Sequence, residues 1–145
     1  MRFPCFKLLF LAFVVFVCLD SSEARRDGNQ KFKVCCARQK KADKECKRMF
    51  CDFNKLSQDN ISFFLNMCTP RGSTVKDMWD CASTHYDHTE CCRRNNVIPE
   101  CLRYCKADDP VTTDYKYLFC VQSFNGIRDC FRSHLDTHAN IFGDN

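Results

Sequence analysis

Cysteine and histidine are the reactive side chains that this sequence carries in a regular pattern. The 145-residue chain has 14 cysteines and 4 histidines. Cys46 and Cys51, and again Cys101 and Cys105, have a spacing loosely like that of zinc ligands. An even number of cysteines in an exported chain favours disulfides instead. The twelve cysteines that we expect to be paired are Cys35, Cys36, Cys46, Cys51, Cys68, Cys81, Cys91, Cys92, Cys101, Cys105, Cys120 and Cys130.

The four histidines fall into two pairs with helical spacing. His85 and His88 are three residues apart. His134 and His138 are four apart, so each pair would share one face of a helix. Two imidazoles on one helix face are a common arrangement of metal ligands, and all four residues are candidates for a metal site. The alternative is that His85 and His134 are packing residues on corresponding helix faces. We expect no cofactor.

No catalytic motif accompanies these residues. Secreted phospholipases have a histidine directly after a double cysteine, but neither Cys35-Cys36 nor Cys91-Cys92 is followed by one. The calcium-binding glycine loop of those enzymes is also missing from the sequence. The sequence has no nucleophile elbow, zinc-protease motif or phosphate-binding loop. If all twelve cysteines are paired, no thiolate remains as a nucleophile. We therefore expect that the protein is not an enzyme.

Residues 1–24 have the three parts of a secretory signal peptide: basic residues, an apolar run over 8–19, and small residues before a cleavage site after Ala24. Such a run makes about 18 Å of helix, too little for a hydrocarbon core of about 30 Å. We expect a secreted, extracellular protein that does not bind nucleic acid and is a monomer, because no cysteine is left for bonding between chains. Asn60-Ile61-Ser62 is an N-glycosylation sequon, with Asn60 as the acceptor.

The cysteines of the mature chain repeat in two units of six. Their spacings are CC-x9-C-x4-C-x16-C-x12-C over residues 35–81 and CC-x8-C-x3-C-x14-C-x9-C over residues 91–130. The shared order indicates an internal duplication. Adjacent cysteines have Cα atoms about 3.8 Å apart, too close for ordinary disulfide geometry, so each double cysteine must reach two partners. The pairing itself stays open.

Helical periodicity runs through the mature chain, and no segment alternates convincingly with the period of a strand. The predicted helices cover residues 60–68, 75–82, 91–106, 112–123 and 127–138. Residues 25–34 are polar and basic and are expected to form a flexible arm, and residues 132–145 are the end of the last helix and a polar tail. The predicted fold class is all-α: a small disulfide-rich helical domain built from two duplicated six-cysteine units, with six disulfides.

A second set of residues has a distinctive order: Cys81-Ala82, Asp87-His88, Cys91-Cys92, Val97, Pro99, Cys101-Leu102, Cys105, Cys120 and Cys130. With these residues the sequence resembles the DB module, a nematode-type extracellular domain defined by twelve cysteines. The resemblance covers residues 35–131 and implies an extracellular module with six disulfides and no established activity. More loosely, paired six-cysteine helical units are similar to domains of glial-factor co-receptors, which would imply ligand or receptor binding.

Positive charge is concentrated near the start of the mature chain. Residues 25–55 contain 11 Lys and Arg against 4 Asp and Glu, whereas residues 56–145 contain 9 against 12. Such a cluster can attract sulfated glycans or anionic lipid headgroups. The alternative is a solvated helix face with Asp43 and Glu45 as internal partners. The candidate polyanion-binding residues are Arg38, Lys40, Lys41, Lys44, Lys47 and Arg48.

Two kinds of function fit this sequence. The first, which we expect, is a secreted disulfide-stapled binding module for an extracellular protein or matrix component. The alternative is a small-molecule or lipid carrier, or a metal-binding protein that uses the histidines. The aromatic residues expected to line a carrier's cavity are Phe63, Phe64, Trp79, Phe119 and Phe131.

Overall fold

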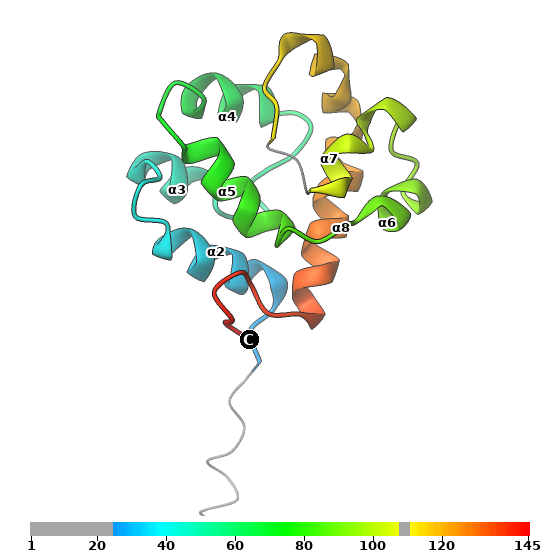
Figure 1. Ribbon diagram of the computed structural model, residues 1–145. Helices are drawn as coiled ribbons and strands as arrows, with labels where there is room; N and C mark the ends of the chain where they lie inside the picture. The colour runs from blue at the N-terminus through cyan, green and yellow to red at the C-terminus, as the bar shows by residue number, and fades with distance from the viewer. Residues whose placement is uncertain (1–24, 108–110) are drawn as a thin grey trace, which may run out of the picture.

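The computed structural model describes residues 25–107 and 111–145 (Figure 1). The predicted signal peptide lies outside these residues. Every regular element within them is a helix, which confirms the predicted all-α fold class. None of the helices in this part of the chain is long and apolar enough to cross a membrane. The α-helices are α2 (Gly28–Arg38), α3 (Lys44–Phe50), α4 (Ile61–Cys68), α5 (Thr74–Ser83), α6 (Thr89–Arg94), α7 (Arg103–Lys106) and α8 (Phe124–Thr137), and the 3₁₀ helices are η1 (Pro99–Cys101) and η2 (Tyr115–Ser123).

Helices α2, α5 and α8 pack against one another and form the centre of the fold (Figure 1). Helix α4 packs against α3 and α5, while α6 and η2 pack against α8. The longest of the described helices, α8, has 14 residues and buries Ile127, Phe131 and Leu135, which belong to the predicted apolar stripe. The clearest amphipathic pattern of the sequence therefore becomes the central packing face.

Six disulfides join the twelve cysteines of residues 35–130, as predicted. The pairs are Cys35–Cys81, Cys36–Cys51, Cys46–Cys68, Cys91–Cys130, Cys92–Cys105 and Cys101–Cys120. In both units the first cysteine pairs with the sixth, the second with the fourth and the third with the fifth. Each double cysteine thus reaches two different partners, and the units 35–81 and 91–130 are cross-linked separately.

The prediction of a flexible arm at residues 25–34 is wrong, because residues 28–34 form the first part of α2. Asp27 caps this helix through a reciprocal pair of contacts with Gln30. Phe32 is 1% exposed and stacks on Phe53, with ring centroids 4.4 Å apart. Gly28 permits a close approach to α8, since a Cβ there would lie 2.6 Å from the Arg132 carbonyl oxygen. Because the segment is rich in charged residues, its sequence did not indicate that one face of the helix is buried.

The prediction of a single helix over residues 91–106 is also wrong, because these residues form three short helices, α6, η1 and α7. Asn96 has a φ of 56°, which an α-helix cannot continue through. Pro99 then begins η1 without a backbone N–H. The helix expected over residues 112–123 is the 3₁₀ helix η2, which begins at Tyr115.

The polar tail after α8 folds back onto α2. The side-chain amide of Asn140, which is 5% exposed, donates to the Lys31 carbonyl at 3.1 Å and accepts from the Phe142 N–H at 2.9 Å. Arg38 and Asp144 form an ion pair at 3.2 Å. The end of the chain is therefore tied to the beginning of the described fold.

Candidate functional site

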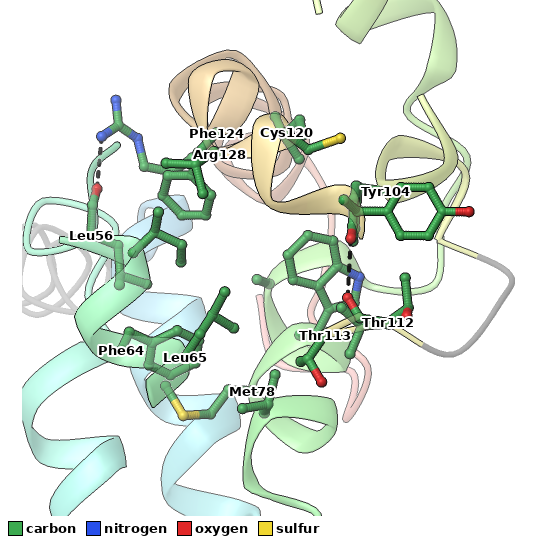
Figure 2. A pocket seen from close by; sticks show the side chains of 18 of the residues that line it. Leu56, Phe64, Leu65, Met78, Tyr104, Thr112, Thr113, Cys120, Phe124 and Arg128 are labelled. Atoms are coloured by element: carbon green, nitrogen blue, oxygen red, sulfur yellow. Dashed lines mark hydrogen bonds between the residues drawn. The ribbon is translucent and has the colours of Figure 1, made fainter. Parts of the chain in front are cut away.

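An apolar cavity of about 120 Å³ lies beneath η2, between α4, α5 and α8 (Figure 2). In Figure 2, Phe64, Leu65 and Met78 lie on one side of this space, and Cys120 and Phe124 lie on the other. Four elements therefore contribute apolar walls to one cavity. We call this cavity, together with the exposed side chains of Tyr115 and Leu118 at its edge, the η2 site.

The floor of the η2 site is a fixed set of aromatic rings. Trp79 makes edge-to-face contacts with Phe131 and Tyr104, at centroid distances of 5.1 Å and 5.9 Å. The Tyr104 hydroxyl donates to the Thr112 carbonyl at 3.1 Å, and burial raises the pKa of this phenol. Tyr104 therefore stays a neutral donor and holds the segment that leads into η2.

Two charged residues line the η2 site, and each is already paired with a neighbouring group. The Arg128 guanidinium donates to the Leu56 carbonyl at 2.7 Å and pairs with Asp129 at 2.7 Å. Asp114 pairs with Lys116 at 3.2 Å. Leu118, in contrast, is an apolar lining residue that is 58% exposed. An apolar cavity bordered by exposed Leu118 and Tyr115 is the candidate binding surface of the described residues.

Three of the five aromatic residues expected to line a cavity do so. These are Phe64, Trp79 and Phe131. Phe63 instead packs its edge on Phe50 with its side chain largely exposed, and Phe119 is 40% exposed.

The sequence reasoning missed Tyr115, Leu118 and Val121 as lining residues. Their spacing of three was the available signal, since residues three apart lie on one edge of a 3₁₀ helix.

Three of the four candidate metal ligands, His88, His134 and His138, lie in an aromatic stack with Tyr86. His134 and His138 stack with centroids 4.0 Å apart, and Tyr86 stacks on His134 at 4.2 Å. His88 packs its edge on His134 at 5.1 Å, whereas His85 is exposed, with its Nδ1 3.9 Å from an Asp80 oxygen. Among the residues that the structure describes, no group of three or more His, Cys, Asp or Glu is arranged to hold a metal ion.

His88 has a structural role at the junction of the two units. It is 3% exposed, and its Nε2 lies 2.8 Å from the Ser83 carbonyl oxygen, so this nitrogen carries the proton and donates. Its backbone N–H donates to the Cys105 carbonyl at 2.8 Å. The ring thus holds the end of α5 and the backbone holds α7. The suggested correspondence of His85 with His134 is wrong for packing, because α5 ends before His85 while α8 continues past His134.

Acidification is expected to weaken the fold through the histidine stack. Burial and the nearby His138 and His88 lower the pKa of His134 to about 4, and burial lowers the pKa of His88. An unfolded histidine titrates near a pKa of about 6.5, so the unfolded chain binds more protons between these values. Stability is therefore full above the unfolded pKa and is lost as the pH falls toward the folded one. For the partly exposed His134, we expect a loss of about 1 kcal/mol between neutral pH and about pH 5.

Urea unfolding of His134→Phe at these two pH values tests this expectation. The variant keeps a ring against Tyr86 but removes the titrating group, so the pH dependence should shrink. His85→Gln, which changes an exposed residue outside the stack, should keep it. An unchanged pH dependence in His134→Phe would contradict this role.

Of the six candidate polyanion-binding residues, two contact other parts of the protein and four extend into solvent. Arg38 points to the tail, where it pairs with Asp144 and lies over the Phe142 ring. Lys47 is half-buried and donates to the Gln39 carbonyl at 2.8 Å. The other four are exposed: Lys40, Lys41, Lys44 and Arg48.

The glycosylation candidate Asn60 is half-buried at the start of α4. Its oxygen accepts from the Ser57 N–H at 2.9 Å, and its nitrogen donates to the Lys55 carbonyl at 2.6 Å. A glycan would replace one of the two amide hydrogens and leave the other for this contact. Glycosylation of Asn60 stays a prediction.

The arrangement of the cysteines has a counterpart among known families. A family model of the DB module matches residues 35–131, which is more than half of the chain. The chain belongs to the DB module family. No curated protein and no solved structure matches it. The DB module is an extracellular cysteine-rich domain, and the helical fold described above continues beyond the matched residues at both ends, through α2 and α8.

Proposed function

We propose that this DB module protein is a secreted binding module whose η2 site receives an apolar side chain of an extracellular protein. The supporting observation is the apolar cavity of about 120 Å³ that opens beside the exposed Leu118. Protein interfaces gain most of their affinity where an anchor side chain fills a desolvated pocket. A rigid disulfide frame lowers the conformational entropy lost when such a pocket is filled.

The size of the cavity favours a protein anchor over a carried lipid. Pockets for small-molecule ligands have volumes of about 300–1,000 Å³. An apolar cavity of about 150 Å³ holds a single benzene ring. The η2 cavity is close to the smaller value, so it fits one aromatic or aliphatic side chain and not a lipid chain.

Two further parts of the proposal concern chemistry and origin. We propose that the module is not catalytic and needs no metal, since the twelve cysteines of residues 35–130 are paired and three of its four histidines are stacked. We also propose that it arose by duplication of a six-cysteine helical unit, which the shared pairing order supports, and that it is a monomer.

Replacing Leu118 with serine is expected to weaken binding to membrane or matrix proteins from the protein's own source by about tenfold or more. Leu118 is 58% exposed, so the change should leave the free energy of unfolding nearly unaltered. The measurement is saturable binding of the purified secreted protein, with bound protein plotted against its concentration.

Phe63→Ser is the matched control, because Phe63 is an equally exposed apolar residue, at 57%, on α4. It should bind like the wild type. Equal loss in both variants would show that general apolar exposure causes the binding. Full binding by Leu118→Ser, or no saturable binding by the wild type, would contradict the proposed site.

A further inference from the structure

Helix α3 and the connection from α2 to α3 lie at one outer edge of the fold (Figure 1), and they carry four exposed cations. Lys40 and Lys41 lie on the connection. Lys44 and Arg48 are four residues apart and share one face of α3. All four side chains are exposed. We call these four residues the α3 basic surface.

The acidic residues beside this surface are occupied by another element. Arg71, from the connection between α4 and α5, contacts Asp43 at 2.8 Å and Glu45 at 3.0 Å. The Cys46 N–H, which donates to the Asp43 carboxyl, and the Arg71 guanidinium both lower the pKa of this carboxyl. The two carboxylates of residues 39–50 thus contact Arg71, and neither lies within ion-pair distance of the neighbouring Lys40, Lys41, Lys44 or Arg48.

The charges of the α3 basic surface are consequently not neutralised by ion pairs with carboxylates of the described residues. Within the described parts of the chain, none of the four has a carboxylate within ion-pair distance, whereas Lys33, Arg38 and Lys76 each have one. Adjacent like charges without counterions repel one another and raise the local positive potential. A polyanion would relieve this repulsion.

The backbone beneath the surface is held firmly. Lys47 donates to the Gln39 carbonyl at 2.8 Å and so ties α3 to the connection before it. The Asp43 N–H donates to the Thr74 hydroxyl at 2.9 Å, and Cys46 is bonded to Cys68 of α4. The spacing of the cations is therefore set by the fold before any ligand binds, which lowers the entropic cost of binding.

We infer that the α3 basic surface is a binding site for a sulfated glycan. Sulfate groups recur along such a chain and can meet cations on both the connection and α3. The four residues of this surface are all cations with no apolar residue among them, whereas membrane-surface helices combine cations with large apolar side chains, which favours a glycan over an anionic membrane. This site is separate from the η2 site, and the inference does not rest on the proposed function.

The test compares the salt dependence of binding to immobilised heparin. Lys40, Lys41 and Lys44 are changed together to glutamine in the full secreted chain. At about 0.15 M salt, the dissociation constant should rise by about tenfold or more. The slope of log affinity against log salt should fall by about two to three, because fewer counterions are released.

The matched control changes Lys55, Arg93 and Arg94 to glutamine, which removes the same net charge from exposed positions elsewhere. It should keep wild-type binding, and both variants should retain six disulfides by mass. Equal weakening in both variants would show that net charge alone causes the binding and would overturn the site. Heparin binding unaffected by the first variant would also overturn it.

Two further probes define the chemistry of the ligand. Desulfated heparin should bind far more weakly than heparin. Phosphatidylcholine–phosphatidylserine vesicles should bind more weakly than heparin at the same salt. Strong binding to the vesicles with none to heparin would replace the glycan by a membrane and overturn the inference.

Discussion

Replacing Cys35 and Cys81 together by alanine is expected to lower the free energy of unfolding by about 4 kcal/mol. This disulfide closes a sequence separation of 46 residues and joins α2 to α5. Its loss frees the longest cross-linked loop of the unfolded chain, which gains conformational entropy. Both residues are fully buried in the core, so lost packing adds to the effect. Urea unfolding followed by circular dichroism measures the change.

Cys92→Ala with Cys105→Ala is the comparison variant. That disulfide closes a separation of only 13 residues, for which the same reasoning gives about 3 kcal/mol. The Cys35–Cys81 variant should therefore be the less stable of the two. If the free energy of unfolding fell by less than about 1.5 kcal/mol in the Cys35–Cys81 variant, the proposed contribution of this disulfide to stability would be contradicted.

Replacing Lys31 by methionine is expected to lower the free energy of unfolding by about 3 kcal/mol. Lys31 is fully buried, and its Nζ donates to the Leu135 carbonyl at 2.8 Å and the His138 carbonyl at 2.9 Å. These carbonyls lie at the C-terminal end of α8, where the helix dipole favours a cation. Methionine fills the same space but leaves both carbonyls without this donor. Thermal and urea unfolding measure the loss.

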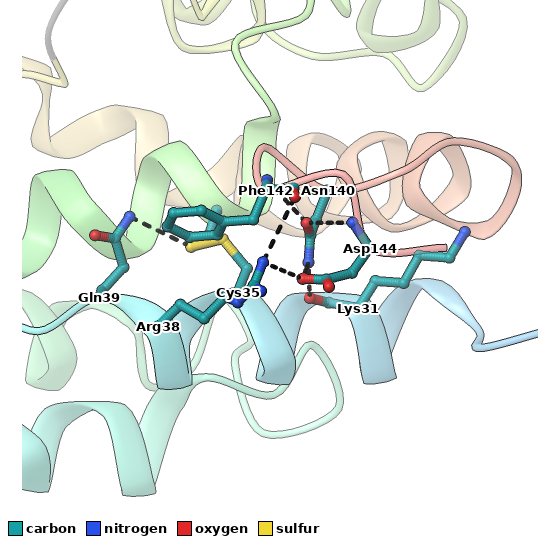
Figure 3. A network of polar contacts seen from close by, with 8 residues as sticks. Lys31, Cys35, Arg38, Gln39, Asn140, Phe142 and Asp144 are labelled. Carbon is teal, nitrogen blue, oxygen red and sulfur yellow. Dashed lines mark hydrogen bonds and ion pairs between the residues drawn. A yellow bond between two sulfur atoms is a disulfide. The ribbon is translucent and has the colours of Figure 1, made fainter.

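The surroundings of Lys31 explain why the tail should loosen as well. Figure 3 shows the Asn140 amide bonded to the Lys31 backbone, with Asp144 and Arg38 beside it. Amide hydrogens of the tail should exchange faster in Lys31→Met. Lys33→Met is the control on the same helix, because Lys33 is exposed and its partner, the buried Asp52, keeps hydrogen bonds from the Asn29 amide and the Asn54 N–H, so the loss should be smaller than for Lys31→Met. Equal losses in both variants would contradict the role of Lys31.

Lys31 also shows where sequence reasoning failed. Residues 25–34 look polar and basic, and only the structure shows that a lysine is buried there to cap another helix. A capping contact between residues 104 positions apart leaves no mark in local periodicity. The apolar stripe of α8, by contrast, is a local pattern, and this helix and the six disulfides are predicted correctly.

The candidate site was predicted only in part for a similar reason. Phe64, Trp79 and Phe131 lie on α-helices whose period is visible in the sequence. Leu118 and Val121 lie on a 3₁₀ helix, whose different period was read as α-helical. The disulfide partners could not be predicted, because many pairings satisfy the same spacing and only the fold selects one.

Photo-crosslinking from position 118 tests the central claim most directly. A photoreactive residue replaces Leu118 in one sample and Phe63 in another, and each secreted protein is irradiated with membrane and matrix proteins of its own source. The account predicts a specific crosslinked protein from position 118, removed by excess wild-type protein, and none from position 63. No competed crosslink from position 118, or the same product from both positions, would contradict the η2 site as the binding surface.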